Sequence, residues 1–150
     1  MSTDLSKYRH DYPMRVRSFH VDRQNVVHNI WYFYFLEEAR VEYLREIGLP
    51  IDEDAFISHH RFYVVRNTCD YYRPAVFDDE IIVKTRTEYV KNSSVGLEHA
   101  IVNAHNGELL VAATHIIVHV NAETNAPERI PDYLRDKIRT HEGDGVRFVE

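Results

Sequence analysis

The chain has 150 residues and a formal net charge of −6, and 44% of its residues are hydrophobic. This length predicts one domain that buries a core without disulfides, and the single cysteine, Cys69, has no partner for an intramolecular bridge. We expect a cytoplasmic protein that neither spans a membrane nor binds nucleic acid, because it has no signal-peptide core, no apolar run near the ~20 residues of a membrane helix and no basic block.

The first elements expected along the chain are a leader and a strand. Residues 1–12 are typical of a loose leader, and the alternation of residues 14–21 predicts a strand. Asn25 is expected to end that strand with a turn, because asparagine tolerates a positive φ better than other residues that carry a side chain.

A long helix is expected next, from Ile30 to Ile47, with Asn29 as its N-cap. Its apolar residues follow helical spacing, and Gly48 and Pro50 suit the end of a helix. The first half, "IWYFYFL", is apolar nearly all round, so we expect it to be enclosed.

The second half of the chain is expected to form strands and a closing helix. The connections between its β-like runs are short, which forces antiparallel neighbours, because a parallel crossover needs a dozen or more residues. We therefore expect an α+β domain in which one five-stranded antiparallel sheet wraps around the long helix. The expected strands cover residues 61–73, 79–90, 94–105 and 108–120, followed by a helix at 132–140 and a mobile tail.

The segment "FHVDRQNVVHNIWYFYFLEEAR" carries a recognisable pattern. Asp22 is followed by a turn residue three positions on, by Asn29 seven positions on and by Tyr32 ten positions on, before a helix that ends "EEARVEYLREIGLP". This pattern, with "CDYYRPAVFDDEIIVKTRTEYV" further on, resembles the hotdog-fold acyl-CoA thioesterases, and the 4-hydroxybenzoyl-CoA thioesterase branch in particular. The resemblance covers roughly residues 14–140, so it implies a single hotdog domain with that core within residues 1–150.

The resemblance implies hydrolysis of an acyl-CoA thioester to a carboxylic acid and free CoA. Asp22 matches the carboxylate that acts as nucleophile or general base. The residues that open the helix, His28, Asn29 and Tyr32, are expected to bind substrate, with backbone amides as the oxyanion hole. Asp22 as a mere turn or capping residue is the alternative.

Two departures from the family pattern limit what is carried over. Asn25 stands where the family usually has glycine, and the turn is expected to survive. Asn29 and Ser18 stand where some relatives carry histidine and tyrosine, so no mechanism that relies on those side chains transfers. His28 lies one position away and is not expected to replace the missing histidine.

Coenzyme A carries several phosphates, so an acidic protein needs a local basic site for it. Arg73, Lys91 and Ser93 are the residues singled out here, and a neighbouring subunit is expected to supply part of the site. The uncovered edges of the sheet predict a homodimer or homotetramer. No cofactor is implied, and no metal site is expected, because the histidines lack zinc-ligand spacing.

Two other functions remain open at this stage. A hotdog hydratase or dehydratase is expected to carry a histidine on the central helix, and this helix has none. A non-catalytic acyl-CoA binding module does not need Asp22. A thioesterase that takes its acyl group from acyl carrier protein instead of CoA is a further variant.

Overall fold

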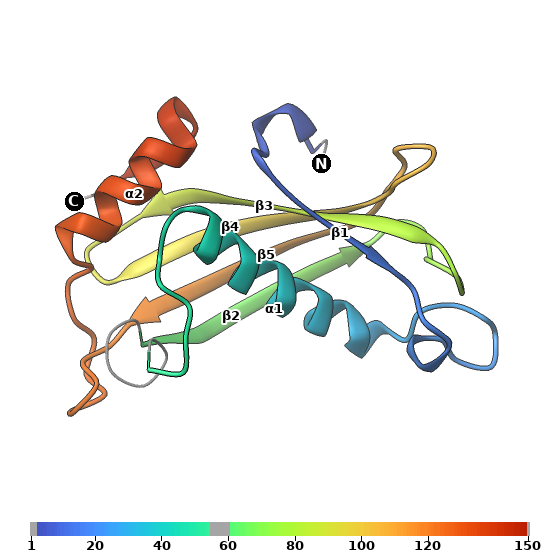
Figure 1. Ribbon diagram of the computed structural model, residues 1–150, viewed down its shortest axis with the longest axis horizontal. Helices are drawn as coiled ribbons and strands as arrows, with labels where there is room; N and C mark the ends of the chain where they lie inside the picture. Colours follow the sequence, from blue (N-terminus) through green and yellow to red (C-terminus); the bar gives the residue numbers. More distant parts are fainter. Residues whose placement is uncertain (1–2, 55–60, 150) are drawn as a thin grey trace.

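An antiparallel sheet lies against one long helix, as the sequence predicts (Figure 1). The computed structural model describes residues 3–54 and 61–149. The strands run in the order β1-β3-β4-β5-β2, and a short β6 pairs with β3 in parallel. The strands are β1 (His10–Arg15), β2 (Phe62–Tyr71), β3 (Glu80–Val90), β4 (Ser94–Asn103), β5 (Leu109–His119) and β6 (Arg147–Phe148), and the helices are α1 (Asn29–Glu46) and α2 (Asp132–Glu142).

The position of the first strand differs from the prediction. β1 starts in the supposed leader, at His10, and ends at Arg15, while Ser18–His20 form a 3-10 turn. The prediction of a strand at 14–21 is therefore wrong, and so is that of a loose leader from His10 on. Pro13 does not interrupt β1, because β1 is an edge strand. The backbone N–H of Arg17 donates to His20 Nδ1 at 2.8 Å, which closes the 3-10 turn.

The tail differs as well. His141 and Glu142 complete α2, and the two residues of β6 pair with Tyr89 and Val90 of β3. The guanidinium of Arg139 lies 4.1 Å from the centre of the Phe148 ring. The prediction of a mobile tail is thus wrong through residue 149, and the sheet has six strands instead of five.

α1 begins one residue earlier than predicted. His28, and not Asn29, is its N-cap, because His28 Nδ1 accepts a hydrogen bond from the Ile30 N–H at 3.2 Å. α1 also ends one residue earlier than predicted, at Glu46, and Gly48 has the expected positive φ, 102°.

One side of α1 packs on the sheet and forms the core. Tyr32, Phe35, Leu36, Ala39 and Tyr43 are buried there. The other side of the N-terminal half is open, so the prediction that this half is enclosed holds on the sheet side only. The exposed fractions of Ile30 and Tyr34, on that open side, are 55% and 60%.

Candidate active site

A short hairpin ahead of α1 fixes the position of Asp22. Val21 and Val27 form an antiparallel bridge, and the Asp22 N–H donates to the Val26 carbonyl at 3.0 Å. Asn25 has φ 61°, which confirms the expected turn, and its Oδ1 accepts from the Phe77 N–H at 3.3 Å. The hairpin is thereby tied to the loop before β3.

The Asp22 carboxylate is held by one oxygen and open at the other. Its Oδ1 accepts from the backbone N–H groups of Gln24 at 2.8 Å and Val26 at 3.4 Å. Its Oδ2 accepts no hydrogen bond from residues 3–54 or 61–149, and the residue is exposed. The carboxylate is therefore oriented by the turn and still free to meet water or a reacting carbon.

The first turn of α1 leaves one backbone donor free. The Ile30 N–H donates to His28 Nδ1, and the Trp31 N–H donates to the His28 carbonyl at 2.9 Å. The Asn29 N–H has no partner in the part of the chain that the structure describes. A free N–H at the positive end of an 18-residue helix is suited to stabilising a developing oxyanion.

A cleft of about 290 Å³ opens beside this free N–H. Asn29, Tyr32 and Arg73, three of the residues singled out from the sequence, line it. Asp22 does not line it but lies on the adjoining hairpin. Tyr71 and Tyr72 line it too and were not predicted, although the aromatic pair in "CDYYRP" was a visible signal.

Tyr32 and Arg73 differ in what holds them. The Tyr32 hydroxyl accepts from the buried Ala75 N–H at 3.2 Å, and burial raises the pKa of Tyr32, so the ring stays neutral. The Tyr32 hydroxyl thus has a structural role, as the hydrogen-bond acceptor of the Ala75 N–H. Arg73 is largely exposed, and its Nε lies 3.8 Å from Glu108 Oε1. A loose surface pair of this kind leaves Arg73 free to bind an anion at the mouth of the cleft.

Lys91 and Ser93 lie far from this cleft within one chain. They form the β3–β4 turn beside α2, at the end of the sheet away from the start of α1 (Figure 1). The 11 residues of β3 separate them from the hairpin, which is roughly 35 Å of strand. The carbonyl of Lys91 accepts from Arg135 Nη2 at 2.8 Å. One chain therefore does not bring these two residues to Asp22.

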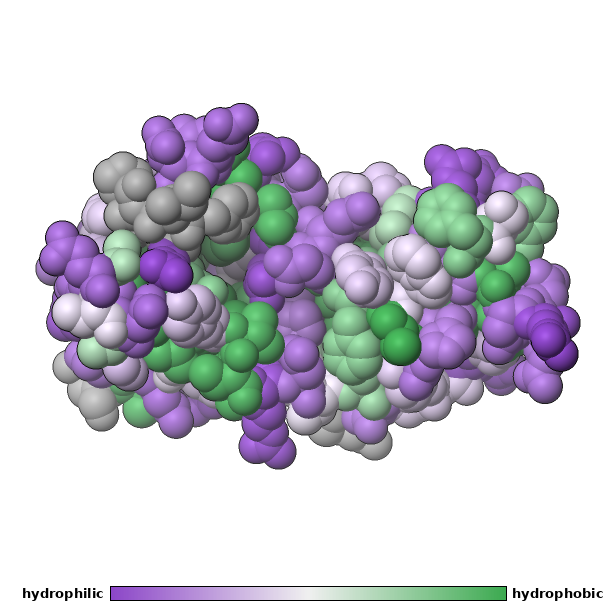
Figure 2. Space-filling view, turned by 90° about the horizontal axis from the view of Figure 1, so that it is seen from below, coloured by the Kyte–Doolittle hydropathy of each residue, from purple (hydrophilic) through white to green (hydrophobic). Residues whose placement is uncertain are grey.

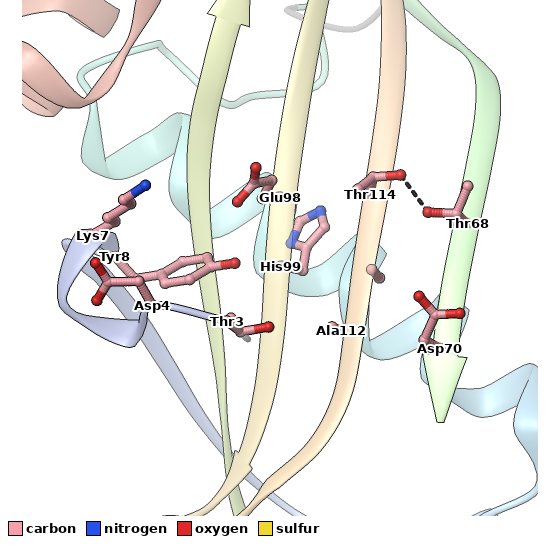
Figure 3. A pocket seen from close by; sticks show the side chains of 11 residues that line it. Thr3, Asp4, Lys7, Tyr8, Thr68, Asp70, Glu98, His99, Ala112 and Thr114 are labelled. Carbon is pink, nitrogen blue, oxygen red and sulfur yellow. Dashed lines mark hydrogen bonds between the residues drawn. The ribbon is translucent and has the colours of Figure 1, made fainter. Parts of the chain in front are cut away.

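A separate hollow of about 220 Å³ lies on the sheet face away from α1, beneath the N-terminal segment (Figure 3). Asp4, Asp70 and Glu98 line it, and the hydroxyls of Thr68 and Thr114 share a hydrogen bond there. Three carboxylates against one lysine, Lys7, make it a poor match for the phosphates of CoA. None of the residues predicted for the active site lines it.

The described residues hold neither a metal-binding cluster nor a membrane-spanning helix. Within residues 3–54 and 61–149, no three His, Cys, Asp or Glu side chains are grouped so that they can hold a metal ion. No helix in the same ranges has the length and apolar character needed to cross a membrane.

Comparison with known proteins gives consistent matches. The model of the thioesterase-like superfamily matches residues 16–138. The chain is 32% identical over 132 residues to the acyl-CoA thioester hydrolase YbgC of Escherichia coli, covering 87% of this chain and 93% of that protein. It is 28% identical over 129 residues to the acyl-acyl carrier protein thioesterase ATL3 of Arabidopsis thaliana, covering 86% and 67%.

Solved structures agree with these relatives. A thioesterase from Thermus thermophilus, crystallised with coenzyme A and Zn, superposes with a TM-score of 0.79 at 29% identity, covering 93% of this chain and 98% of that one. The 1,4-dihydroxy-2-naphthoyl-CoA thioesterase Slr0204 from Synechocystis gives 0.78 at 18% identity, covering 86% and 94%. The predicted hotdog fold is confirmed.

Proposed function

Because this chain belongs to the thioesterase-like superfamily and is a thioester hydrolase, we propose that it hydrolyses acyl-CoA thioesters to a carboxylic acid and free CoA. The free Asn29 N–H at the start of α1 is the observation that carries this proposal. The thioester carbonyl oxygen accepts from this N–H, and the negative charge that develops on the oxygen is stabilised there.

Asp22 supplies the other half of the reaction. Its free Oδ2 either attacks the carbonyl carbon, giving an anhydride that water then opens, or removes a proton from the attacking water. In both routes the C–S bond breaks and CoA leaves as the thiol. His28 contributes by capping Ile30, and Tyr32 by holding the loop beside the cleft.

Two copies of the chain complete the site. β2 is an edge strand of ten residues that pairs only with β5 within residues 3–54 and 61–149, and several of its large apolar side chains are exposed. Figure 2, seen from the β2 side, shows apolar side chains gathered in two groups on this surface. An exposed apolar edge invites pairing with another strand, so we propose a dimer in which two β2 strands pair and cover Ile30 and Tyr34 of α1.

The dimer also bears on CoA binding. Arg73 lies at the cleft of its own chain. Lys91 and Ser93 serve a site only if a second copy carries them to it, because one chain holds them at the far end of β3. We propose that Arg73 is the main residue that binds the CoA phosphates.

Release of free thiol from a panel of acyl-CoA and acyl-acyl carrier protein thioesters tests the proposal. We expect steady thiol release from at least one acyl-CoA. Thiol release from acyl-acyl carrier protein alone would mean that the substrate is an acyl-acyl carrier protein and not an acyl-CoA. A hydratase would consume an enoyl thioester without releasing thiol, and a binding module would do neither. The absence of release from every thioester would overturn the proposed function.

A further inference from the structure

His20 is a buried histidine next to the hairpin that carries Asp22. Its exposed fraction is 6%, and its Nδ1 accepts a hydrogen bond from the Arg17 N–H at 2.8 Å. Burial lowers the pKa of His20 below its usual value, so the ring is neutral near pH 7. A neutral imidazole carries one proton, and because Nδ1 is an acceptor, the proton is on Nε2. Within residues 3–54 and 61–149 this Nε2–H has no hydrogen-bond partner.

The imidazole of His20 is held in one orientation by neighbouring rings. The ring centres of Phe19, Trp31 and Phe35 lie 4.4, 4.7 and 4.8 Å from its own, each in an edge-to-face arrangement. The hydrogen bond from Arg17 fixes the remaining rotation. The Nε2–H is therefore a fixed donor among apolar groups, where a donor without an acceptor is costly. An oxygen of a bound molecule would remove this cost.

A pocket of about 420 Å³, called here the His20 pocket, lies between α1 and β1. Trp31 and Phe35 of α1 line one wall, and Tyr12 and Met14 of β1 line another. Its size and its ring-rich walls suit an acyl group that is mainly apolar.

The proposed dimer leaves the His20 pocket open. β1 and β2 are the two ends of the main strand order, and the dimer pairs β2 with β2. Trp31, Phe35 and Glu38 follow helical spacing along the side of α1 next to β1, where the Tyr12 hydroxyl donates to Glu38 Oε2 at 3.0 Å. Of the lining residues, Tyr34 alone belongs to the surface that the dimer covers, and it is 60% exposed at the rim.

Asp22 lies on the same side of the hairpin as His20. Val21, between them, is extended, with φ −100° and ψ 151°, so the side chains before and after it point the same way, with Cα atoms roughly 7 Å apart. Val21 bridges Val27, and Val27 lines the cleft at Asn29. The hairpin thus separates the cleft from the His20 pocket, which explains why Asp22 does not line the cleft.

This arrangement gives the two halves of a thioester different places. With the carbonyl oxygen at the Asn29 N–H, CoA leaves through the cleft past Arg73, and the acyl group extends on the Asp22 side. The His28 N–H donates to the His20 carbonyl at 3.0 Å, so the His20 pocket adjoins the residue that precedes Asn29.

We propose that the acyl group occupies the His20 pocket and that His20 Nε2–H donates a hydrogen bond to an oxygen on it. The favoured substrates are then CoA thioesters of hydroxy acids or oxo acids. This inference rests on the proposed function and adds the class of acyl group to it. A neutral oxygen suits the donor, because the ring is neutral and the pocket is lined by charges of both signs, Arg15 and Arg17 against Glu38.

The test compares kcat/KM, by thiol release, for a straight-chain acyl-CoA and for partners of equal length. The partners carry a hydroxyl or keto group at the third carbon, or a hydroxyl in the middle or at the end of the chain. We expect the wild type to prefer at least one oxygenated partner by about 10- to 100-fold, because the plain chain leaves the Nε2–H unpaired.

Two variants separate the donor from the structural role of His20. In His20→Asn the amide oxygen can still accept from the Arg17 N–H, but no donor reaches the Nε2 position. The preference should be lost, with kcat/KM falling for the oxygenated partner and changing little for the plain chain. In His20→Gln the amide N–H can reach that position, so part of the preference should remain. A purely structural role predicts the reverse order of the two variants.

His119→Asn is the matched control. His119 is 4% exposed, its Nδ1 lies 3.2 Å from the Glu128 carbonyl oxygen and its ring lies 5.2 Å from that of Phe62, but it does not line the His20 pocket. This variant should keep the wild-type preference. His20→Phe keeps a ring among the aromatic neighbours and takes the place of His20→Asn if that variant fails to fold.

The outcomes separate the two proposals. If no acyl-CoA of either kind releases thiol, the proposed function itself fails. If plain chains are hydrolysed as well as or better than every oxygenated partner, only the role of His20 in binding the acyl group is refuted. A preference that persists in the folded His20→Asn or His20→Phe protein refutes that role too, and so does an equal loss of preference in His119→Asn.

Discussion

Replacing Asp22 by asparagine should remove most of the activity and leave the fold intact. The amide keeps the Oδ1 that accepts from Gln24 and Val26 and removes the charge that attacks carbon or activates water. Loss of a positioned general base lowers turnover by ~10²–10⁴-fold, which corresponds to about 3–5 kcal/mol of activation free energy. The Asn29 N–H is unchanged, so KM should change little.

The cost in stability should be much smaller. Asp22 is exposed, and both of its hydrogen bonds to the turn persist with a neutral acceptor. Neutral hydrogen bonds are weaker than charged ones, and solvent screens the difference, so we expect a loss of about 1 kcal/mol or less in the free energy of unfolding. The effects on turnover and on stability are therefore separable.

Thiol release with the best acyl-CoA, together with denaturant unfolding of the same samples, measures both effects. Asp79→Asn is the matched control, because Asp79 Oδ2 accepts from the Val76 N–H at 2.9 Å in a neighbouring turn that the Val26–Val76 bridge joins to the hairpin. It should have wild-type turnover. If Asp22→Asn also keeps turnover within about threefold of wild type, the catalytic role of Asp22 is refuted.

Three further predictions concern assembly, stability and pH. Val65 of β2 is 59% exposed, and Val65→Lys places a charge on this edge strand. The variant should shift the dimer toward monomer in sedimentation and should lower the activity. An unchanged mass in sedimentation would contradict the proposed pairing of β2 strands. Tyr32→Phe removes the acceptor of the buried Ala75 N–H and should cost about 1–3 kcal/mol in denaturant unfolding, whereas an unchanged midpoint would mean that this bond contributes nothing. Burial lowers the pKa of His99 and His115 below the ordinary value of about 6.5, so in acid the unfolded chain binds more protons than the folded one. The free energy of unfolding should therefore decrease as the pH is lowered from about 6.5. His115 alone should account for a loss of about 3 kcal/mol by about pH 4. Unfolding free energies that stay constant from about pH 7 to 4 would refute this.

Local patterns in the sequence were enough to predict most of the helices and strands and the turn that follows Asp22. Helical spacing and Gly48 located α1 within one residue at each end, and the short connections set the antiparallel strands. Asn25 adopts the positive φ expected of the turn after Asp22. These features depend on residues close together in the chain, so their physical causes are visible in the sequence.

The tertiary structure decided which distant residues meet. β1 begins at His10 because its backbone pairs with β3, about 70 residues later in the chain, and this pairing outweighs the alternation seen at 14–21. His20 and Met14 had no local signal of a shared pocket with Phe35, since only the packing of α1 beside β1 brings them together. Lys91 is far from Asp22 for the same reason: strand order and register, which depend on long-range hydrogen bonding and packing, set the distances between elements.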